Sequence, residues 1–274
     1  MKKIAIAQVE SSTDKHGNLR AALRLIEEAK RKSAQLIAFP EFLMAFSPAS
    51  QTAEELAQIA EPLDGPFLTA LRDAARVAGI SVVATIYEKS TLPDRVYDTA
   101  IWIDVRGHTA SVYRKLHLYD AFGFKESDKF HAGEDISPLV QSGETRLGMM
   151  ICYDLRFPEM ARMLTLQGAN VLIAPSGWVQ GDLKVEHWQT MLKARALENG
   201  CYLIAPDQVG NIYIGHSMAV DPLGRALVDL DEQPGVAVVE LDLNLVRETR
   251  DKLPLLKNRR TDVYARHAAD NKLP

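Results

Sequence analysis

Three apolar segments of this chain end in the same way, with a proline directly after the last hydrophobic residue. They are residues 36–39, 171–174 and 202–205, which precede Pro40, Pro175 and Pro206. Proline lacks the N–H that an interior strand donates, so each segment predicts a strand that leaves its sheet at that point. Segments with helical spacing of apolar residues separate these strands. This alternation predicts an α/β fold, in which ligands collect beyond the carboxyl ends of the strands.

The remaining pattern predicts a single domain over residues 1–274. Further strands are expected at 4–9, 80–86, 97–104, 109–113, 149–151, 218–220, 226–228 and 236–241, and helices at 19–29, 66–78, 158–164 and 188–197. The residues 105–108 contain a glycine and predict a hairpin turn between two of the strands. No change in composition marks a linker, and a polar, basic tail begins at about residue 245.

Bulk composition excludes several classes of protein. Of the 274 residues, 47% are hydrophobic and 25% are charged, and the formal net charge is −4. Nucleic acid binding needs a basic excess and a membrane span needs a run of about 18 apolar residues, and the sequence has neither. The first residues resemble a signal peptide, but Gln8 and Glu10 interrupt the apolar run, which therefore predicts a first strand. The two cysteines, Cys152 and Cys201, lack metal-ligand spacing and predict a reducing, cytoplasmic location.

A cysteine occupies the turn between a predicted strand and a predicted helix. The apolar run 149–151 ends at Cys152, a charged turn follows, and Pro158 opens the helix at the position where proline is best tolerated. A sulfur placed there lies beyond the sheet and close to a helix N-terminus, whose dipole favours a thiolate. A buried structural cysteine is the alternative, although a core position would not be flanked by Asp154 and Arg156. We therefore expect Cys152 to be a nucleophile.

A cysteine nucleophile needs a base and a group that stabilises the oxyanion. None of the seven histidines directly follows a strand, whereas Glu41 comes directly after a strand-ending proline in an apolar setting that suits a general base. Lys115 stands at the end of a predicted strand, where its ammonium would stabilise a thiolate and an oxyanion. The backbone N–H of Tyr153 is a second candidate oxyanion donor. Taken singly, Glu41 also fits a solvated turn, and Lys115 also fits an exposed surface position.

Three segments together resemble the nitrilase, or carbon–nitrogen hydrolase, superfamily. They are FPE at 39–41, YRKLHL at 113–118 and ICYDLRFPE at 151–159. The catalytic Glu, Lys and Cys of the superfamily occur in this order and at comparable spacing, so the resemblance gives these roles to Glu41, Lys115 and Cys152. Glu126 resembles the second glutamate of the family, which helps to position the lysine and the substrate. The resemblance extends from the first strand to residues 258–264.

The resemblance implies a four-layer αββα sandwich that pairs with a second subunit, with the tail from about residue 245 at the dimer interface. It implies no metal and no organic cofactor. In the implied reaction Glu41 takes the thiol proton, Cys152 attacks the carbonyl of a small amide, and Lys115 with the Tyr153 N–H holds the oxyanion. Ammonia leaves with a proton from Glu41, and water then hydrolyses the thioester to a carboxylic acid.

The residues after the cysteine, YDLRFPE at 153–159, resemble the Nit branch of the superfamily, which contains deaminated-glutathione amidase and ω-amidase. The substrates of this branch are amides of small carboxylated acids, so the resemblance implies a cation that binds the carboxylate. Arg156 and Lys129 are candidates for this cation. Arg156 would equally well pair with Asp154 or Glu159 and brace the turn.

One segment departs from the pattern of the Nit branch, and this departure leaves the substrate open. The departure lies at residues 176–183, and we expect Trp178 within it to line the pocket and change its shape. A small aliphatic amidase and an N-carbamoyl-amino-acid hydrolase therefore remain alternatives. A non-catalytic binding protein of the same fold would not need the full Glu–Lys–Cys set. A thiol redox role is a further alternative, but Cys201 begins a buried strand and would be a poor partner for Cys152.

Overall fold

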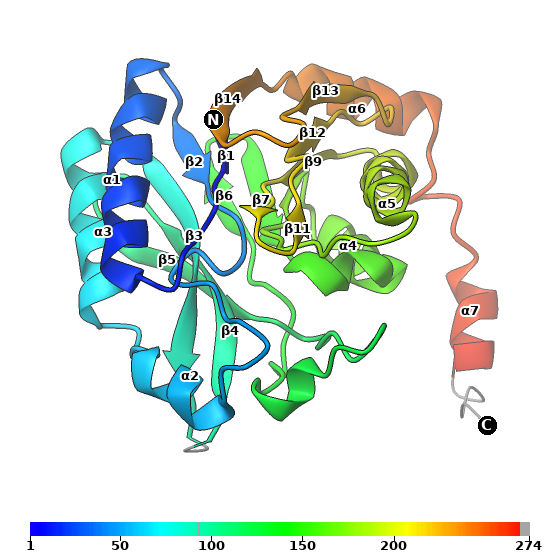
Figure 1. Ribbon diagram of the computed structural model, residues 1–274. Helices are drawn as coiled ribbons and strands as arrows, with labels where there is room; N and C mark the ends of the chain where they lie inside the picture. The colour runs from blue at the N-terminus through cyan, green and yellow to red at the C-terminus, as the bar shows by residue number, and fades with distance from the viewer. Residues whose placement is uncertain (92–93, 269–274) are drawn as a thin grey trace.

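The computed structural model describes residues 1–91 and 94–268, which form two six-stranded sheets (Figure 1). In spatial order the first sheet contains β14 (Gly235–Glu240), β1 (Lys3–Gln8), β2 (Leu36–Ala38), β3 (Ser81–Lys89), β4 (Val96–Ile103) and β5 (Thr109–Arg114). The second contains β13 (Ala226–Asp229), β12 (Met218–Val220), β9 (Tyr202–Ala205), β8 (Val171–Ile173), β7 (Thr145–Met149) and β6 (Val140–Ser142). A short ribbon pairs β10 (Val209–Gly210) with β11 (Tyr213–Ile214).

Helices cover the outer face of each sheet (Figure 1). The first sheet is covered by α1 (Lys15–Arg31), α2 (Ala53–Ile59) and α3 (Pro66–Ala78), and the second by α4 (Pro158–Leu166) and α5 (Lys184–Asn199). The remaining helical segments are the 3₁₀ turns η1 (Glu126–Asp128) and η2 (Cys152–Arg156), and the C-terminal helices α6 (Leu243–Lys252) and α7 (Thr261–Ala268). The expected four-layer αββα sandwich is therefore confirmed.

The interior of the sandwich is a continuous apolar core between the two sheets. Ile6, Val83 and Trp102 of the first sheet belong to one buried cluster with Leu172 and Ile204 of the second. A separate cluster joins the other face of the first sheet to α1 and α3. Strands that are buried on both faces need apolar residues at every position, which explains the unbroken apolar runs of β2, β8 and β9.

The parallel strands of both sheets end at one common edge. Strands β1 to β3 run parallel in the first sheet and β7 to β9 in the second. Val9, just beyond β1, forms a bridge with Gln208, just beyond β9. The buried Gln208 amide donates to the backbone carbonyl of Glu41 (2.8 Å) and to Ser11 Oγ (2.8 Å). One side chain thus ties the strand ends of the two sheets together.

The structure differs from the expected elements at several places. The strand expected at 149–151 is β7 and ends at Met149, α5 begins at Lys184 and not at residue 188, and α7 was not expected. The differences at α1, α2 and α6 have a common cause. Helix α1 begins at Lys15 and not at residue 19, because Asp14 caps it and accepts the His16 N–H (3.0 Å). The apolar pattern does not predict α2, although Thr52 and Glu55 form a capping box at its start. Helix α6 occupies part of the expected polar tail and is capped by Asp242. Capping residues locate these helix starts where apolar periodicity does not.

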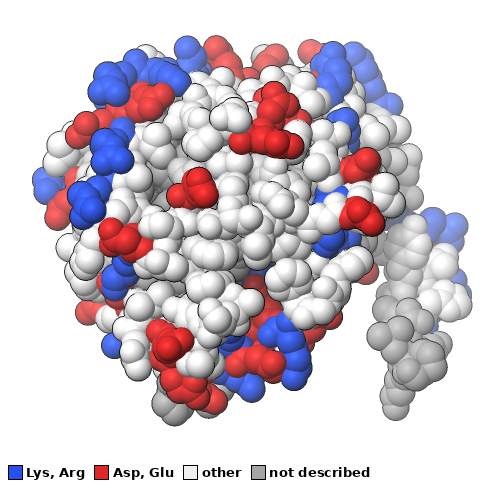
Figure 2. All heavy atoms as spheres, viewed as in Figure 1, with Lys and Arg blue, Asp and Glu red and all other residues white. Residues whose placement is uncertain are grey.

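The surface carries charges of both signs. Figure 2 shows acidic and basic side chains interspersed over the viewed face. In Figure 1, α7 stands apart from the layers of the sandwich. No helix within residues 1–91 and 94–268 is both long enough and apolar enough to cross a lipid bilayer.

Replacement of Leu172 by alanine tests the core between the sheets. Leu172 is fully buried in β8, so Leu172→Ala should lower the free energy of unfolding by about 2–5 kcal/mol, because it removes buried methyl groups and leaves a cavity. Chemical denaturation measures this change. Val77→Ala is the control, because Val77 is 79% exposed on α3. Equal effects of the two substitutions would contradict the packing described here.

Candidate active site

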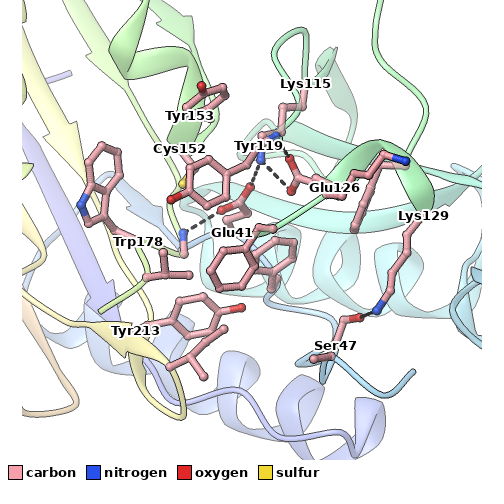
Figure 3. Close-up of a pocket in the computed structure, with 18 of the residues that line it drawn as sticks. Glu41, Ser47, Lys115, Tyr119, Glu126, Lys129, Cys152, Tyr153, Trp178 and Tyr213 are labelled. Carbon is pink, nitrogen blue, oxygen red and sulfur yellow. Dashed lines mark hydrogen bonds and ion pairs between the residues drawn. The ribbon is translucent and has the colours of Figure 1, made fainter. Parts of the chain in front are cut away.

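A cavity of about 720 Å³ opens beyond the common edge of strand ends (Figure 3). Its lining includes Glu41, Lys115 and Cys152, which the sequence predicts as site residues. The sequence also places Ser176 and Asp207 at strand ends. Both are fully buried and lie outside the lining of the cavity. Of the four residues expected to emerge at the site, only Glu41 and Cys152 line the cavity.

Glu41 follows the proline that ends β2, and hydrogen bonds hold both of its carboxylate oxygens. Oε1 lies 2.7 Å from the Lys115 ammonium, and Oε2 accepts the backbone N–H of Gly177 (2.7 Å). The residue is fully buried. Glu41 is therefore a fixed, desolvated carboxylate that borders the cavity beside Cys152.

Lys115 lies just beyond β5 and is 1% exposed. Its ammonium contacts Glu41 and Glu126 at 2.7 and 2.9 Å, and it lies 4.0 Å from Asp98. Figure 3 shows the ammonium between the two glutamates. Burial alone lowers the pKa of Lys115, but Glu126 and Glu41 outweigh burial and keep the pKa well above its ordinary value. Lys115 is therefore a buried cation at any pH near neutrality.

Glu126 lies in η1, in the segment that connects β5 to β6. Its Oε2 accepts the backbone N–H of Tyr119 (2.6 Å), while its Oε1 contacts Lys115. This pair of bonds ties the loop to the lysine. The structure therefore brings Glu41, Lys115, Glu126 and Cys152 together, as the resemblance implies.

Asp98 is a member of this cluster that the sequence analysis missed. It is 1% exposed in β4, and neither of its carboxylate oxygens has a hydrogen-bond partner among the described residues. Burial, followed by the negative charge of Glu41, raises the pKa of Asp98 well above its ordinary value. The raised pKa favours the protonated form of Asp98. The signal in the sequence was a single carboxylate at position 98, on the same face of the strand as the buried Ala100 and Trp102.

Cys152 is held in a strained turn. Its φ is +42°, a left-handed conformation that is rare for residues other than glycine, and its N–H donates to the Pro175 carbonyl (2.9 Å). Burial, followed by the charge of Glu41, raises the pKa of the Cys152 thiol well above its ordinary value. Desolvation thus acts against the resting thiolate that the sequence analysis expects.

Asp154 holds the turn after the cysteine in place. It is fully buried and accepts hydrogen bonds from the Ile151 N–H (2.8 Å) and the Tyr113 hydroxyl (2.5 Å). His117 Nδ1 lies 2.7 Å from the same carboxylate, and the His117 ring stacks on Phe157. Asp154 therefore links β5, the segment after it and the elbow, and it makes no ion pair with an arginine among the described residues.

Tyr153 occupies the first turn of η2 and lines the cavity. The N–H groups of a first helical turn have no acceptor within the helix, so such a group is available to a ligand. The ring of Tyr153 packs edge-on against Tyr119 and Phe157.

The three residues predicted to contact substrate all line the cavity, at different places. The Arg156 guanidinium lies 4.6 Å from the centre of the Trp178 ring and makes no ion pair with Asp154 or Glu159. Lys129 lies at the other side, with its ammonium near Ser47 Oγ (3.5 Å) and the Pro48 carbonyl (3.2 Å). Figure 3 shows Trp178 and Lys129 on opposite sides of Glu41. The cavity therefore has a cation at each side.

Two groups of side chains have the composition of metal ligands. Oxygen atoms of Glu41, Asp98 and Glu126 lie within 4.8 Å of one another, but the Lys115 ammonium already lies among them and neutralises part of their charge. The second group is His216, Asp229 and Asp231, in which His216 Nδ1 lies 3.0 Å from Asp229 Oδ1.

Comparison with known proteins identifies the family. Residues 3–251 match the carbon-nitrogen hydrolase family. This chain belongs to that family. It is 38% identical over 243 residues to the deaminated glutathione amidase of Escherichia coli O157:H7, which covers 89% of this chain and 91% of the relative. It is 33% identical over 277 residues to the deaminated glutathione amidase of Rattus norvegicus, over 95% of this chain and 83% of the relative.

Solved structures of this family share the fold. The NitFhit protein of C. elegans superposes with a TM-score of 0.88 and 32% identity over 96% of this chain, which spans only 66% of the NitFhit chain. An amidase from Nesterenkonia sp. AN1 superposes with a TM-score of 0.79 and 27% identity over 97% of this chain and 99% of the amidase. In that structure acrylamide has added to the active-site cysteine of the amidase. The chain is therefore a cysteine-dependent hydrolase of carbon–nitrogen bonds.

Substitution of Asp98 tests its protonation. Its ordinary pKa is 3.8 and its folded pKa is raised, so the folded state holds a proton that the unfolded state releases above pH 3.8. Because the folded state binds this extra proton, the free energy of unfolding falls as the pH rises above 3.8. Asp98→Asn should therefore raise the melting temperature near pH 7, and the gain should shrink as the pH falls towards 4. Thermal unfolding at several pH values measures this. A lower melting temperature at pH 7 would indicate an ionised Asp98 that pairs with Lys115.

Proposed function

We propose that this chain is an amidase of the Nit type that hydrolyses the amide of a small carboxylated acid through a thioester on Cys152. The observation that carries this proposal is the buried Lys115 ammonium, which joins Glu41 and Glu126 beside the strained Cys152 elbow. A buried carboxylate, cation and thiol at the wall of one cavity provide a base, an electrostatic clamp and a nucleophile.

Glu41 acts first as the general base. The thiol of Cys152 is protonated at rest, so its proton must move as the sulfur attacks the carbonyl carbon. Glu41 takes this proton, since its carboxylate is held at the cavity wall by Lys115 and Gly177. The new S–C bond forms while the carbonyl electron pair moves to oxygen. The buried resting thiol also protects the site from reactions with other electrophiles.

Lys115 and the Tyr153 N–H stabilise the oxyanion. An ammonium has three N–H donors, and Glu41 and Glu126 use two of them. The third N–H of Lys115 is then available to the oxyanion. Collapse of the intermediate expels ammonia or an amine, which takes the proton from Glu41. Water deprotonated by Glu41 then attacks the thioester, and the thiolate that leaves recovers this proton.

The names of the relatives favour deaminated glutathione or a related ω-amide as the substrate. The cations Arg156 and Lys129 in the cavity wall support a substrate that carries a carboxylate. A small aliphatic amidase is the second candidate, because the similar Nesterenkonia protein is an amidase whose active-site cysteine, in the E41Q mutant, accommodates the small amide acrylamide as a Michael adduct. An N-carbamoyl-amino-acid hydrolase would use the same catalytic groups.

A panel of substrates with two cysteine variants tests the activity. The panel contains α-ketoglutaramate, deaminated glutathione, glutamine, propionamide, an N-carbamoyl amino acid and a nitrile, with ammonia or amine release as the readout. We expect turnover of the ω-amides, and Cys152→Ala should lower it by about 10³-fold or more. Cys201→Ala is the matched control, because Cys201 is a buried free cysteine outside the cavity.

Each outcome of the panel has a separate meaning. Turnover of propionamide or the N-carbamoyl compound alone would keep the mechanism and change the substrate. Activity that survives Cys152→Ala would exclude Cys152 as the nucleophile. No turnover of any compound would favour a non-catalytic binding protein.

We also propose that the protein is a cytoplasmic, single-domain homodimer whose tail packs on the second subunit. The free state of both cysteines is consistent with a reducing compartment. Helix α7 has eight residues and lies apart from the sandwich, and so short a helix is not stable alone in water. Leu255 and Tyr264 in this region are 37% and 55% exposed. A second subunit would cover these side chains.

Charge introduced into the tail tests the dimer. Wild type should have the mass of a dimer by light scattering, and the double substitution Leu255→Glu with Tyr264→Glu should shift it towards monomer, because burial of two carboxylates is unfavourable. Val105→Glu is the control, since Val105 is an exposed apolar residue in the turn between β4 and β5. A monomeric wild type, or a double variant that stays dimeric, would contradict the proposed interface.

A further inference from the structure

Two cations in the wall of the cavity have no carboxylate partner. Lys184, the first residue of α5, is 5% exposed, and Arg156 is half-buried. Neither residue forms an ion pair within the described parts of the chain, 1–91 and 94–268. The Nε of Arg156 is buried and has no hydrogen-bond partner there. The sequence analysis considered Arg156 and missed Lys184.

Aromatic rings surround both cations. The Lys184 ammonium donates to the Tyr119 hydroxyl (2.7 Å) and lies 4.1 Å from the centre of the Phe122 ring. Arg156 lies over Trp178. Rings stabilise a cation only in part, and they leave two of the three N–H donors of the ammonium unused. Burial, followed by the nearby Arg156, lowers the pKa of Lys184. Two like charges in this setting are therefore stabilised by an anion that binds between them.

The position of Lys184 is fixed by its backbone. The chain before it adopts left-handed conformations at Gly181 (φ +146°) and Leu183 (φ +58°), and α5 begins directly afterwards. The indole N–H of Trp178 donates to the Lys184 carbonyl (3.0 Å). This hydrogen bond links Trp178, the ring on which Arg156 stacks, to Lys184. The pair is preorganised, which lowers the entropic cost of binding a ligand.

The cavity wall is divided by charge. Glu41, Asp98 and Glu126 surround Lys115 on one side of Cys152, and Arg156 and Lys184 lie on the side of Trp178. Figure 3 shows Cys152 between Lys115 and Trp178, the ring on which Arg156 stacks. When the carbonyl carbon of an amide contacts Cys152, one end of the amide therefore extends towards Arg156 and Lys184.

We propose that Lys184 and Arg156 together bind a carboxylate of the substrate and thereby select carboxylated amides over uncharged ones. This inference rests on the proposed amidase function. Lys184 is the determining residue, because it lines the cavity and its ammonium makes only one hydrogen bond within the described residues, to Tyr119. Lys129, on the opposite side, is the competing site for the same carboxylate.

Matched amides test this selection. Glutaramate and pentanamide differ only by a carboxylate in place of a methyl group. Lys184→Met should lower kcat/KM for glutaramate by about 10- to 100-fold, the expected loss of a charged hydrogen bond, and change that for pentanamide by less than about threefold. Lys184→Arg should retain much of the preference for glutaramate over pentanamide. Lys125→Met is the control for charge, because Lys125 is exposed at the cavity mouth and already pairs with Asp128 (2.8 Å).

A binding measurement separates this inference from the catalytic proposal. In the Cys152→Ala protein, millimolar glutaramate should raise the melting temperature and pentanamide should not, and Lys184→Met should abolish the glutaramate effect. Equal losses for both amides, a preference removed by Lys129→Met, or a protein that glutaramate does not stabilise would overturn the role of Lys184. Activity that survives Cys152→Ala would instead refute the catalytic proposal, whatever Lys184 does.

Discussion

The buried ammonium of Lys115 is the interaction on which the site depends. It contacts Glu41 and Glu126 and lies near Asp98, all within an apolar sandwich. Three ionised carboxylates around one cation would carry a net negative charge that such an interior does not tolerate. The raised pKa of Asp98 favours its neutral form, which lowers this charge. Lys115 and the Gly177 N–H hold the carboxyl group of Glu41 in one orientation.

The second constraint is the elbow at Cys152. A positive φ places the sulfur in the cavity, and this strained backbone persists because Pro175 and Asp154 hold it from both sides. Burial raises the pKa of the thiol, so the proposed reaction needs a base to take its proton. The fold thereby couples two sheets: Glu41, the proposed base, follows β2, and Cys152, the proposed nucleophile, follows β7.

Local signals in the sequence predicted most of the fold. The prolines after β2, β8 and β9 marked strand ends correctly, because proline cannot donate to a sheet. The apolar pattern missed α2 and α6, whose starts are marked by polar caps and not by apolar periodicity. Glu41, Lys115, Cys152 and Glu126 were found because each lies in a recognisable motif. Asp98 and Lys184 were missed because neither lies in one, and a single charged residue usually indicates solvent exposure.

The sequence alone determined most of the alternating strands and helices, since these follow from local pattern. Its motifs determined the resemblance that implies the αββα sandwich, and they determined the candidate base, cation and nucleophile. Only the tertiary structure decided their protonation and their partners. Lys184 approaches the cavity of Cys152 from the start of another helix, and Asp98 approaches Lys115 from a neighbouring strand. Burial and the distance between charges set these properties, and both arise only when segments far apart in the chain pack together.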